Sequence, residues 1–285
     1  MENSKAECCL QKKFHYFRKQ IIEKRAAVTN RHVFITGAAK RIGKALSEAF
    51  AVGGYSLILH ANKSIGKLEQ LADQFRTNGT NVTCYACDFG NRSETSDFAS
   101  RIMAKHKIDL LINNASMFEN DRLPNVTDAE IDAHMNVNFH APRLLMTQMY
   151  AACCRDNREG HIINLLDHKL RILNPDFFSY TMSKAALGTM TKTSAMQFAP
   201  NVRVNSISPG IALISGKQTK ADFEASWSSA PMGRSATPAQ IADAALFLDR
   251  CPAIHGEDIV IDGGQSLYQL PRDIAFLSKH GSEKV

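Results

Sequence analysis

The sequence has no apolar run long enough to span a bilayer, and its start lacks the apolar core of a signal peptide. Its seven cysteines are odd in number and suggest no disulfide framework. Cys84 and Cys87 have Cys-x-x-Cys spacing, but no second such pair and no histidine pair completes a zinc site. These absences argue against a membrane-spanning, secreted or metal-binding protein, and they favour a cytoplasmic one with reduced cysteines.

The net charge of +6 is concentrated near the start of the chain. Residues 1–30 hold seven Lys or Arg against three Glu, and they belong to no motif. We expect a basic N-terminal extension that is poorly ordered or contacts a partner, with a membrane-surface helix as the alternative. No nucleic-acid module or basic-aromatic interleaving is present, so nucleic acid is not an expected partner. Because the first interpretation of the extension is favoured over the membrane-surface helix, a membrane is not an expected partner either. Residues 31–285 are predicted to form a single domain.

A strand, a glycine turn, a helix and a second strand follow one another from residue 33. Residues 33–36 are a short apolar run, Gly37 opens the turn, Gly43 sits early in an amphipathic helix, and residues 55–59 read as the next strand. A helix N-terminus reached through such a turn presents backbone N–H groups to a pyrophosphate. The unit is Rossmann-like, except that Arg41 occupies the place of a third glycine.

The end of the second strand indicates which dinucleotide is bound. A carboxylate there would accept a hydrogen bond from the ribose 2′-hydroxyl and select NAD, but residues 55–66 contain none. Instead, Lys40 and Arg41 in the first loop and Lys63 and Ser64 in the second offer cations and a hydroxyl to a 2′-phosphate. Either loop alone would suit a solvated basic surface. Together they favour NADP(H).

Strands and helices continue to alternate along the chain. Further strands are predicted at residues 81–89, 108–116, 160–167, 202–210 and 257–264, and helices at 67–78, 93–106, 128–156, 179–198 and 238–249. This alternation predicts a Rossmann-like, doubly wound α/β sheet of about seven parallel strands with helices on both faces. The strand C-termini then meet at one edge, where ligands bind, and they bring together Thr36, Asp88, Asn114, Asp167 and Pro209.

Three residues near the fifth strand carry the candidate chemistry. Tyr180 and Lys184 are four residues apart, so both side chains lie on one helix face. A phenol has a pKa near 10, and a nearby cation lowers that pKa and makes the group a usable acid. Asp167 lies thirteen residues upstream at a predicted strand end. The next residue, His168, is expected to be a surface loop residue, with a substrate contact as the alternative.

Six motifs in this order resemble the short-chain dehydrogenase/reductases over residues 33–265: TGAAKRIG, NNAS, Asn138, YTMSK, SPG and DGG. The resemblance implies that Tyr180 donates a proton, that Lys184 holds the nicotinamide ribose and lowers the tyrosine pKa, and that Asn138 supports a relay water. It also implies a homotetramer. The expected NADP(H) site consists of Gly37, Lys40, Arg41, Ile42, Asn62, Lys63, Ser64, Asp88, Phe89, Asn114, Ala115, Ser116, Pro209, Gly210 and Ile211.

Asp167 departs from the serine that most of this family has at that position. An ionised carboxylate only accepts hydrogen bonds, so it suits a substrate with N–H donors or a ring nitrogen that must be protonated. With Arg41 and Phe118, it resembles the pteridine reductases, in which the phenylalanine stacks on the pterin and the arginine reaches cofactor and substrate. Ser116 is also expected to contact substrate. Each of the three also has a structural interpretation: Asp167 as a loop cap, Phe118 as core, and Arg41 as a cofactor contact alone.

These features predict an NADPH-dependent reductase that transfers hydride to a C=N bond of a dihydropterin or dihydrofolate, with Tyr180 and Asp167 handling the proton. Residues 211–233 are expected to form a substrate loop, with Trp227 and Met232 as lid contacts or lid core. Two alternatives are a carbonyl reductase of the same fold and a non-catalytic NADPH-binding regulator. Asp167 disfavours the first, and the intact Tyr180 and Lys184 disfavour the second.

Overall fold

One parallel sheet organises the chain, and the computed structural model describes it over residues 31–214 and 218–276. The predicted extension, residues 1–30, lies outside the described residues. The strand order β3-β2-β1-β4-β5-β6-β7 confirms the predicted doubly wound sheet. The strands are β1 His32–Ile35, β2 Ser56–Ala61, β3 Val82–Ala86, β4 Leu110–Asn113, β5 Gly160–Leu165, β6 Val202–Pro209 and β7 Asp258–Ile261.

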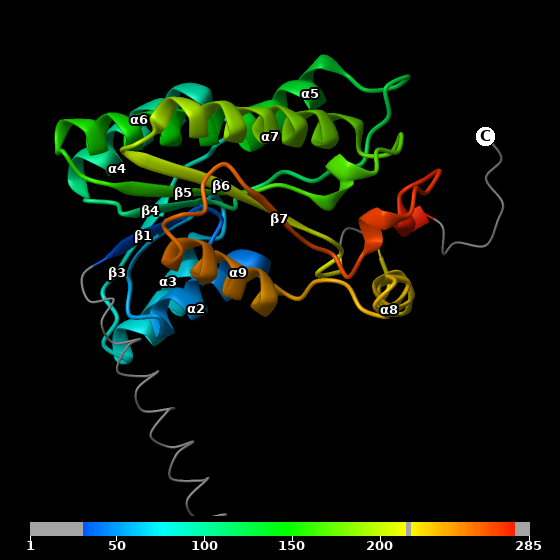
Figure 1. Ribbon diagram of the computed structural model, residues 1–285, viewed down its shortest axis with the longest axis horizontal. Coiled ribbons are helices and arrows are strands. Elements are labelled where there is room, and N and C mark those ends of the chain that lie inside the picture. The colour runs from blue at the N-terminus through cyan, green and yellow to red at the C-terminus, as the bar shows by residue number, and fades with distance from the viewer. Residues whose placement is uncertain (1–30, 215–217, 277–285) are drawn as a thin grey trace, which may run out of the picture.

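Helices cover both faces of the sheet, as the sequence predicts (Figure 1). One face carries α2 Arg41–Val52, α3 Ile65–Thr77 and α9 Pro238–Arg250. The other carries α4 Arg92–Lys105, α5 Asp128–Met135, α6 Ala141–Arg155 and α7 Phe178–Phe198. The order reverses between β1 and β4, and the crevice at such a reversal is where ligands bind in open α/β sheets.

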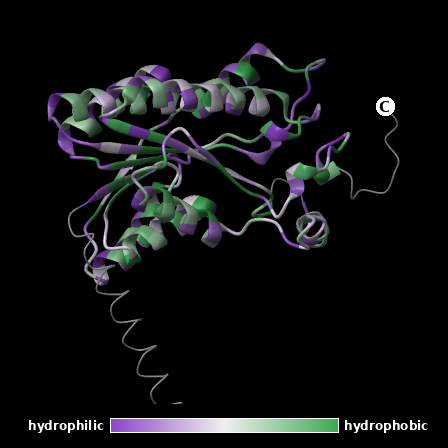
Figure 2. Ribbon diagram, viewed as in Figure 1, coloured by the Kyte–Doolittle hydropathy of each residue, from purple (hydrophilic) through white to green (hydrophobic). Residues whose placement is uncertain are grey.

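The core consists of two apolar clusters, one on each face of the sheet, because successive strand residues point to opposite sides. Val33 and Ile35 pack into one cluster, while Phe34 packs into the other. All three are fully buried. Figure 2 accordingly shows hydrophobic residues both in the strands and in the helices that flank them. Strands buried on both faces read as continuous apolar runs, which is why they could be predicted.

Two predicted segments differ from the structure. The helix predicted at 128–156 is divided by a π-helical turn, η1 Asn136–His140, between α5 and α6. The loop predicted at 211–233 contains a short helix, α8 Lys220–Ser228, which begins at a capping box formed by Thr219 and Asp222. This helix has no clear apolar stripe, so periodicity alone does not reveal it. Among the residues that the structure describes, no helix has the length and apolar character needed to cross a bilayer.

Candidate active site

The glycine turn after β1 is hydrogen-bonded to the residues that follow β4. The side-chain amide of Asn114 donates to the carbonyl oxygens of Thr36 at 2.8 Å and of Gly37 at 3.2 Å. The hydroxyl of Thr36 accepts from the backbone N–H of Ala115 at 2.9 Å. Gly37 has a φ of +66°, and a Cβ there would come 2.9 Å from the Cα of Ala115. The turn therefore needs glycine both for its backbone angle and for its close approach to β4.

His60 also supports this turn, although the sequence analysis does not identify it. Its Nδ1 accepts from the backbone N–H of Gly37 at 3.3 Å, so Nε2 carries the hydrogen and donates to the carbonyl of Cys87 at 3.0 Å. Burial lowers the pKa of His60 to about 4, which keeps the ring neutral. Its ring stacks on Phe89, with 4.0 Å between centroids. Phe89, an expected cofactor contact, is only 4% exposed, so its ring serves the core.

Arg41 begins α2 in the left-handed region, with a φ of +55°. A non-glycine residue rarely adopts this conformation, and here it falls at the place where the dinucleotide fingerprint has a glycine. Strained backbone of this kind concentrates at functional sites. The guanidinium Nη1 donates to the carbonyl of Ile214 at 2.6 Å and so joins the glycine turn to the segment after β6. The next residue, Ile42, packs partly buried against the core.

A basic cavity of about 370 Å³ opens beside the glycine turn. Lys40 lines it from the β1 side, and Asn62, Lys63 and Ser64 line it from the end of β2. Within the described residues, neither Lys40 nor Lys63 forms an ion pair, and no carboxylate lines the cavity. The side chain of Asn62 donates to Asp88 at 2.9 Å at the end of β3. The two loops that predicted a 2′-phosphate site thus form one positively charged hollow.

Asn138 connects the strand-end segment to α7 from within the π-helical turn. It is fully buried, and its Oδ1 accepts from the backbone N–H of Met117 at 2.8 Å. Its Nδ2 donates to the carbonyl of Met117 and to the hydroxyl of Ser183, both at 2.9 Å. Ser116, the residue before Met117, is exposed. The described contacts position the segment that carries Phe118, and the relay-water role of Asn138 stays a prediction.

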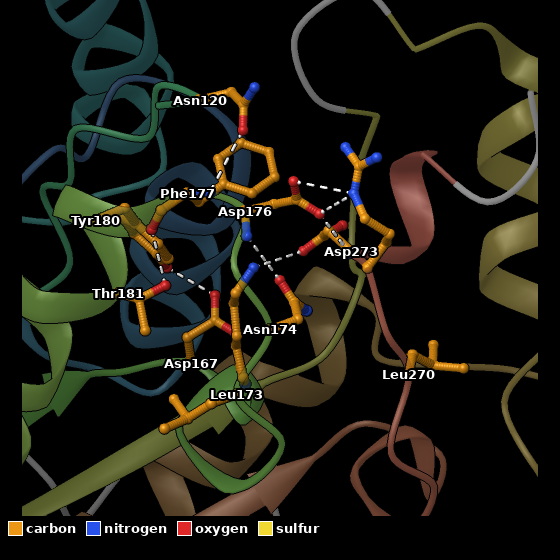
Figure 3. A network of polar contacts seen from close by, with 12 residues as sticks. Asn120, Asp167, Leu173, Asn174, Asp176, Phe177, Tyr180, Thr181, Leu270 and Asp273 are labelled. Carbon is orange, nitrogen blue, oxygen red and sulfur yellow. Dashed lines mark hydrogen bonds and ion pairs between the residues drawn. The ribbon is translucent and has the colours of Figure 1, made fainter. Parts of the chain in front are cut away.

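Asp167 and Tyr180 meet directly at the C-terminal edge of the sheet (Figure 3). The hydroxyl of Tyr180 donates to Oδ2 of Asp167 at 2.6 Å. Burial, followed by the charge and hydrogen bond of Asp167, raises the pKa of Tyr180 well above 10. Burial opposes ionisation of Asp167, but hydrogen bonds from His168, Tyr180 and the backbone of Lys169 lower its pKa below the ordinary value. At neutral pH the pair is therefore a phenol bound to a carboxylate.

The prediction that Lys184 lowers the pKa of Tyr180 is wrong for this arrangement. The ammonium donates to the carbonyl of Leu165 at 2.7 Å and lies 5.7 Å from the centroid of the tyrosine ring. Burial lowers the pKa of Lys184 to about 8, while the charge of Asp167 opposes that shift. The ammonium of Lys184 is held at the end of β5, and the pKa of Tyr180 is instead set by burial and by Asp167, which both raise it.

His168 differs from its prediction as a surface loop residue. Its side chain is only 16% exposed, and the residue begins the 3-10 turn η2 His168–Arg171. Its Nδ1 lies 3.2 Å from Oδ1 of Asp167 and 3.1 Å from the carbonyl of Pro209 at the end of β6. The same strand end holds Gly210, whose N–H donates to Ile261, and Ile211, whose N–H donates to Gln265.

Two phenylalanine rings pack next to Tyr180 of this pair. Phe118 is 39% exposed, stacks on Phe177 with 4.3 Å between centroids, and meets Tyr180 edge-on at 4.6 Å. Phe177 precedes α7 with a φ of +56°, which is strained for a bulky residue. Phe118 is thus not an ordinary core residue. No sequence signal distinguishes Phe177, because its importance rests on that backbone angle and on the stack.

A buried carboxylate holds the surrounding segments together. Asp176 is fully buried and accepts hydrogen bonds from Arg122, Arg272 and the backbone N–H of Asp273. Figure 3 shows Asp176 near Asp273 and Phe177. The ring of Phe276 stacks on that of Phe177, with 5.8 Å between centroids. Asp176 therefore connects segments 118–123 and 270–276 beside the aromatic rings. Of the two predicted lid residues, Trp227 donates to Ala236 at 3.0 Å, and Met232 is 66% exposed.

Residues 37–266 match the family model described as enoyl-(acyl carrier protein) reductase. The chain belongs to the short-chain dehydrogenase/reductase superfamily. Within this superfamily, the chain is 32% identical over 236 residues to the 3-oxoacyl-[acyl-carrier-protein] reductase FabG of Thermotoga maritima, covering 81% of this chain and 95% of the relative. It is 30% identical to an NAD-dependent glycerol dehydrogenase of Listeria innocua, covering 84% and 95%.

Two solved structures are also similar to this chain. FolM alternative dihydrofolate reductase 1 from Brucella canis, solved with NADP, matches with a TM-score of 0.81 and 34% identity, covering 87% of this chain and 98% of that one. The Brucella suis protein of the same name, also in complex with NADP, matches with a TM-score of 0.75 and 33% identity, covering 84% and 96%.

Proposed function

We propose that this oxidoreductase is an NADPH-dependent reductase of a pterin ring, of the dihydropterin or dihydrofolate type. The observation that carries the proposal is the hydrogen bond of 2.6 Å between the Tyr180 hydroxyl and the Asp167 carboxylate, beneath the exposed ring of Phe118. A carboxylate next to a protonated phenol suits a heterocycle that presents N–H groups and must gain a proton at nitrogen. The likeness to two dihydrofolate reductase structures supports the same substrate class.

The described residues fit NADP(H). Gly37 leaves room for close backbone approach at the start of α2, and Lys40, Asn62, Lys63 and Ser64 line the cavity proposed for a 2′-phosphate. The two Brucella structures hold the same cofactor. When bound, NADPH supplies the hydride that reduces the C=N carbon. We further propose the cytoplasm as the location and a homotetramer as the assembly.

The side chains of the site orient the substrate and deliver its proton. Phe118 offers an aromatic face on which a flat ring can stack, which holds the acceptor carbon in one place. Tyr180 keeps its proton at neutral pH and can release it to a ring nitrogen as that nitrogen becomes basic. Asp167 can accept hydrogen bonds from substrate N–H groups with the lone pairs that Tyr180, Lys169 and His168 leave open.

The proposal is tested by following NADPH oxidation by the full chain with dihydrobiopterin, dihydromonapterin, dihydrofolate and acetoacetyl thioesters. A second candidate, reduction of a carbonyl thioester, is favoured by the likeness to the Thermotoga reductase. We expect turnover with at least one dihydropterin and none with the thioesters, because Asp167 offers no hydrogen to a neutral carbonyl. Turnover with the thioesters alone would overturn the proposal. NADPH binding without NADPH oxidation in the presence of any of these substrates would instead favour the alternative of a non-catalytic NADPH-binding regulator.

Cofactor selection can be tested at Lys63. Lys63→Ala removes a cation from the basic cavity, so we expect the Kd for NADPH to rise by about tenfold, while the Kd for NADH changes by less than about twofold. Fluorescence titration with both nucleotides measures this. Lys67→Ala, which removes an exposed lysine of α3 that does not line the cavity, is the matched control. Equal losses for both nucleotides would refute the assignment of this cavity to the 2′-phosphate.

A further inference from the structure

His168 makes an unusual pair of contacts. Its Nδ1 faces two oxygen acceptors, the carboxylate of Asp167 at 3.2 Å and the carbonyl of Pro209 at 3.1 Å. A nitrogen between two acceptors carries the hydrogen, so Nδ1 is a donor in either charge state. Protonation at Nε2 then converts the ring to an imidazolium without disturbing these contacts. The ring is 16% exposed, which leaves it a route to exchange that proton with solvent.

Asp167 is consequently a carboxylate held from two sides. Oδ1 faces His168 and accepts from the backbone N–H of Lys169 at 2.8 Å, while Oδ2 accepts from Tyr180 at 2.6 Å. The three side chains form a line from the end of β6, through Asp167, to the phenol beneath Phe118. A charge on His168 therefore acts on the carboxylate to which the proton-donating phenol is bound.

We propose that His168, in its protonated form, is a positioning residue that orients Asp167 and balances the negative charge formed when Tyr180 gives up its proton. The inference rests on the proposed pterin reduction. In that step the O–H bond of Tyr180 breaks as an N–H bond forms on the substrate, and the hydride goes to the adjacent carbon. The phenolate and Asp167 then carry two negative charges, which the imidazolium and Lys184 offset. Water reprotonates the phenolate before the next turnover.

The groups around His168 favour its charged form. Burial disfavours the imidazolium, but the hydrogen bond and charge of Asp167 raise the pKa of His168 above 6.5. Asp262, beyond β7, adds a second negative charge and is itself held ionised by N–H groups of Gly264 and Ser266. Lys169 pairs with Asp273 at 3.0 Å, Tyr180 is neutral, and Lys184 is the opposing cation across the carboxylate.

The test uses the full chain and the variant His168→Asn, whose amide can donate where Nδ1 does but cannot ionise. We expect wild-type kcat to fall as pH rises through the elevated His168 pKa, because the positive charge is lost. In H168N, kcat at about pH 6 should be about tenfold lower than in the wild type. The kcat of H168N should also no longer fall as the pH rises through that range. NADPH affinity should stay the same. His32→Asn, at the opposite end of the sheet and 3.8 Å from Asp109, should keep the wild-type profile.

An activity-independent measurement separates this inference from the proposed function. Imidazole titration by NMR should give His168 a midpoint above 6.5 in the wild type and a lower one in Asp167→Asn. A midpoint at or below 6.5, or one unchanged in D167N, would overturn the inference even if pterins are reduced. Pterin turnover with an unaltered pH profile in H168N would overturn the role of His168 alone. Absence of pterin turnover in the wild type would overturn both proposals.

Discussion

Tyr180→Phe should reduce kcat for the pterin substrate by about 10²–10⁴-fold, the range that a positioned general acid contributes. The change removes the hydroxyl that donates to Asp167 at 2.6 Å and leaves the ring beside Phe118 in place. Asp167→Ala should cause a loss of similar size, because it removes the acceptor that orients the same proton. The Kd for NADPH should change by less than about threefold in both, since neither side chain lines the basic cavity. Steady-state kinetics with NADPH titration measures both quantities.

Tyr150→Phe is the matched control for the tyrosine change. Tyr150 lies on α6 and stacks on Phe198 with 4.3 Å between centroids, away from Asp167. Its kcat should equal that of the wild type. Wild-type turnover in both Y180F and D167A would show that the pair does not deliver the proton, and the proposed chemistry would then be wrong.

Gly43→Ala should have the largest effect on the fold and on cofactor binding. A Cβ at this position would lie 2.1 Å from the carbonyl oxygen of Gly37 and 2.9 Å from the Cα of Ala38. Both are backbone atoms of the glycine turn, so the turn must move. We expect a loss of about 1–3 kcal/mol or more in the free energy of unfolding. For a domain of this size, the corresponding fall in Tm is roughly 2–12 °C.

The same displacement should weaken NADPH binding by at least about tenfold, because the backbone N–H groups at the start of α2 are moved. Gly66→Ala is the control, since a Cβ there meets no atom within 4 Å at the start of α3. Its Tm should stay the same or rise slightly, as alanine favours a helix over glycine. Equal Tm values for G43A and the wild type would contradict the close approach of α2 to its own turn.

The elements that could be predicted are those with a strong local signal. The buried apolar strands and the glycine turn predicted the parallel sheet, because burial on both faces leaves continuous apolar runs. The strand order, and with it the reversal between β1 and β4, is known only from the structure. Lys40 and Lys63 could be brought together because they follow neighbouring strands. Asp167 and Tyr180 could be associated through a strand end and the following helix. Their direct hydrogen bond confirms that association.

What could not be predicted depends on contacts between distant segments. His60 supports Gly37 through a ring nitrogen, and nothing in the sequence around it indicates that role. The pKa of Tyr180 shifts upward rather than downward, because the shift depends on burial and on where the ammonium of Lys184 lies. Helix spacing places the lysine on the correct face but does not set that position.

The buried carboxylate of Asp176 has a consequence for how selectivity can change. It binds Arg122 of one segment and Arg272 of another, so the segments that carry Phe118 and Phe276 both depend on a single anion. We therefore expect substitutions in residues 270–276 to change the surroundings of the aromatic rings at the proposed pterin site while the parallel sheet keeps its form. Relatives with the same sheet would then differ in the molecules they accept through one short stretch of chain.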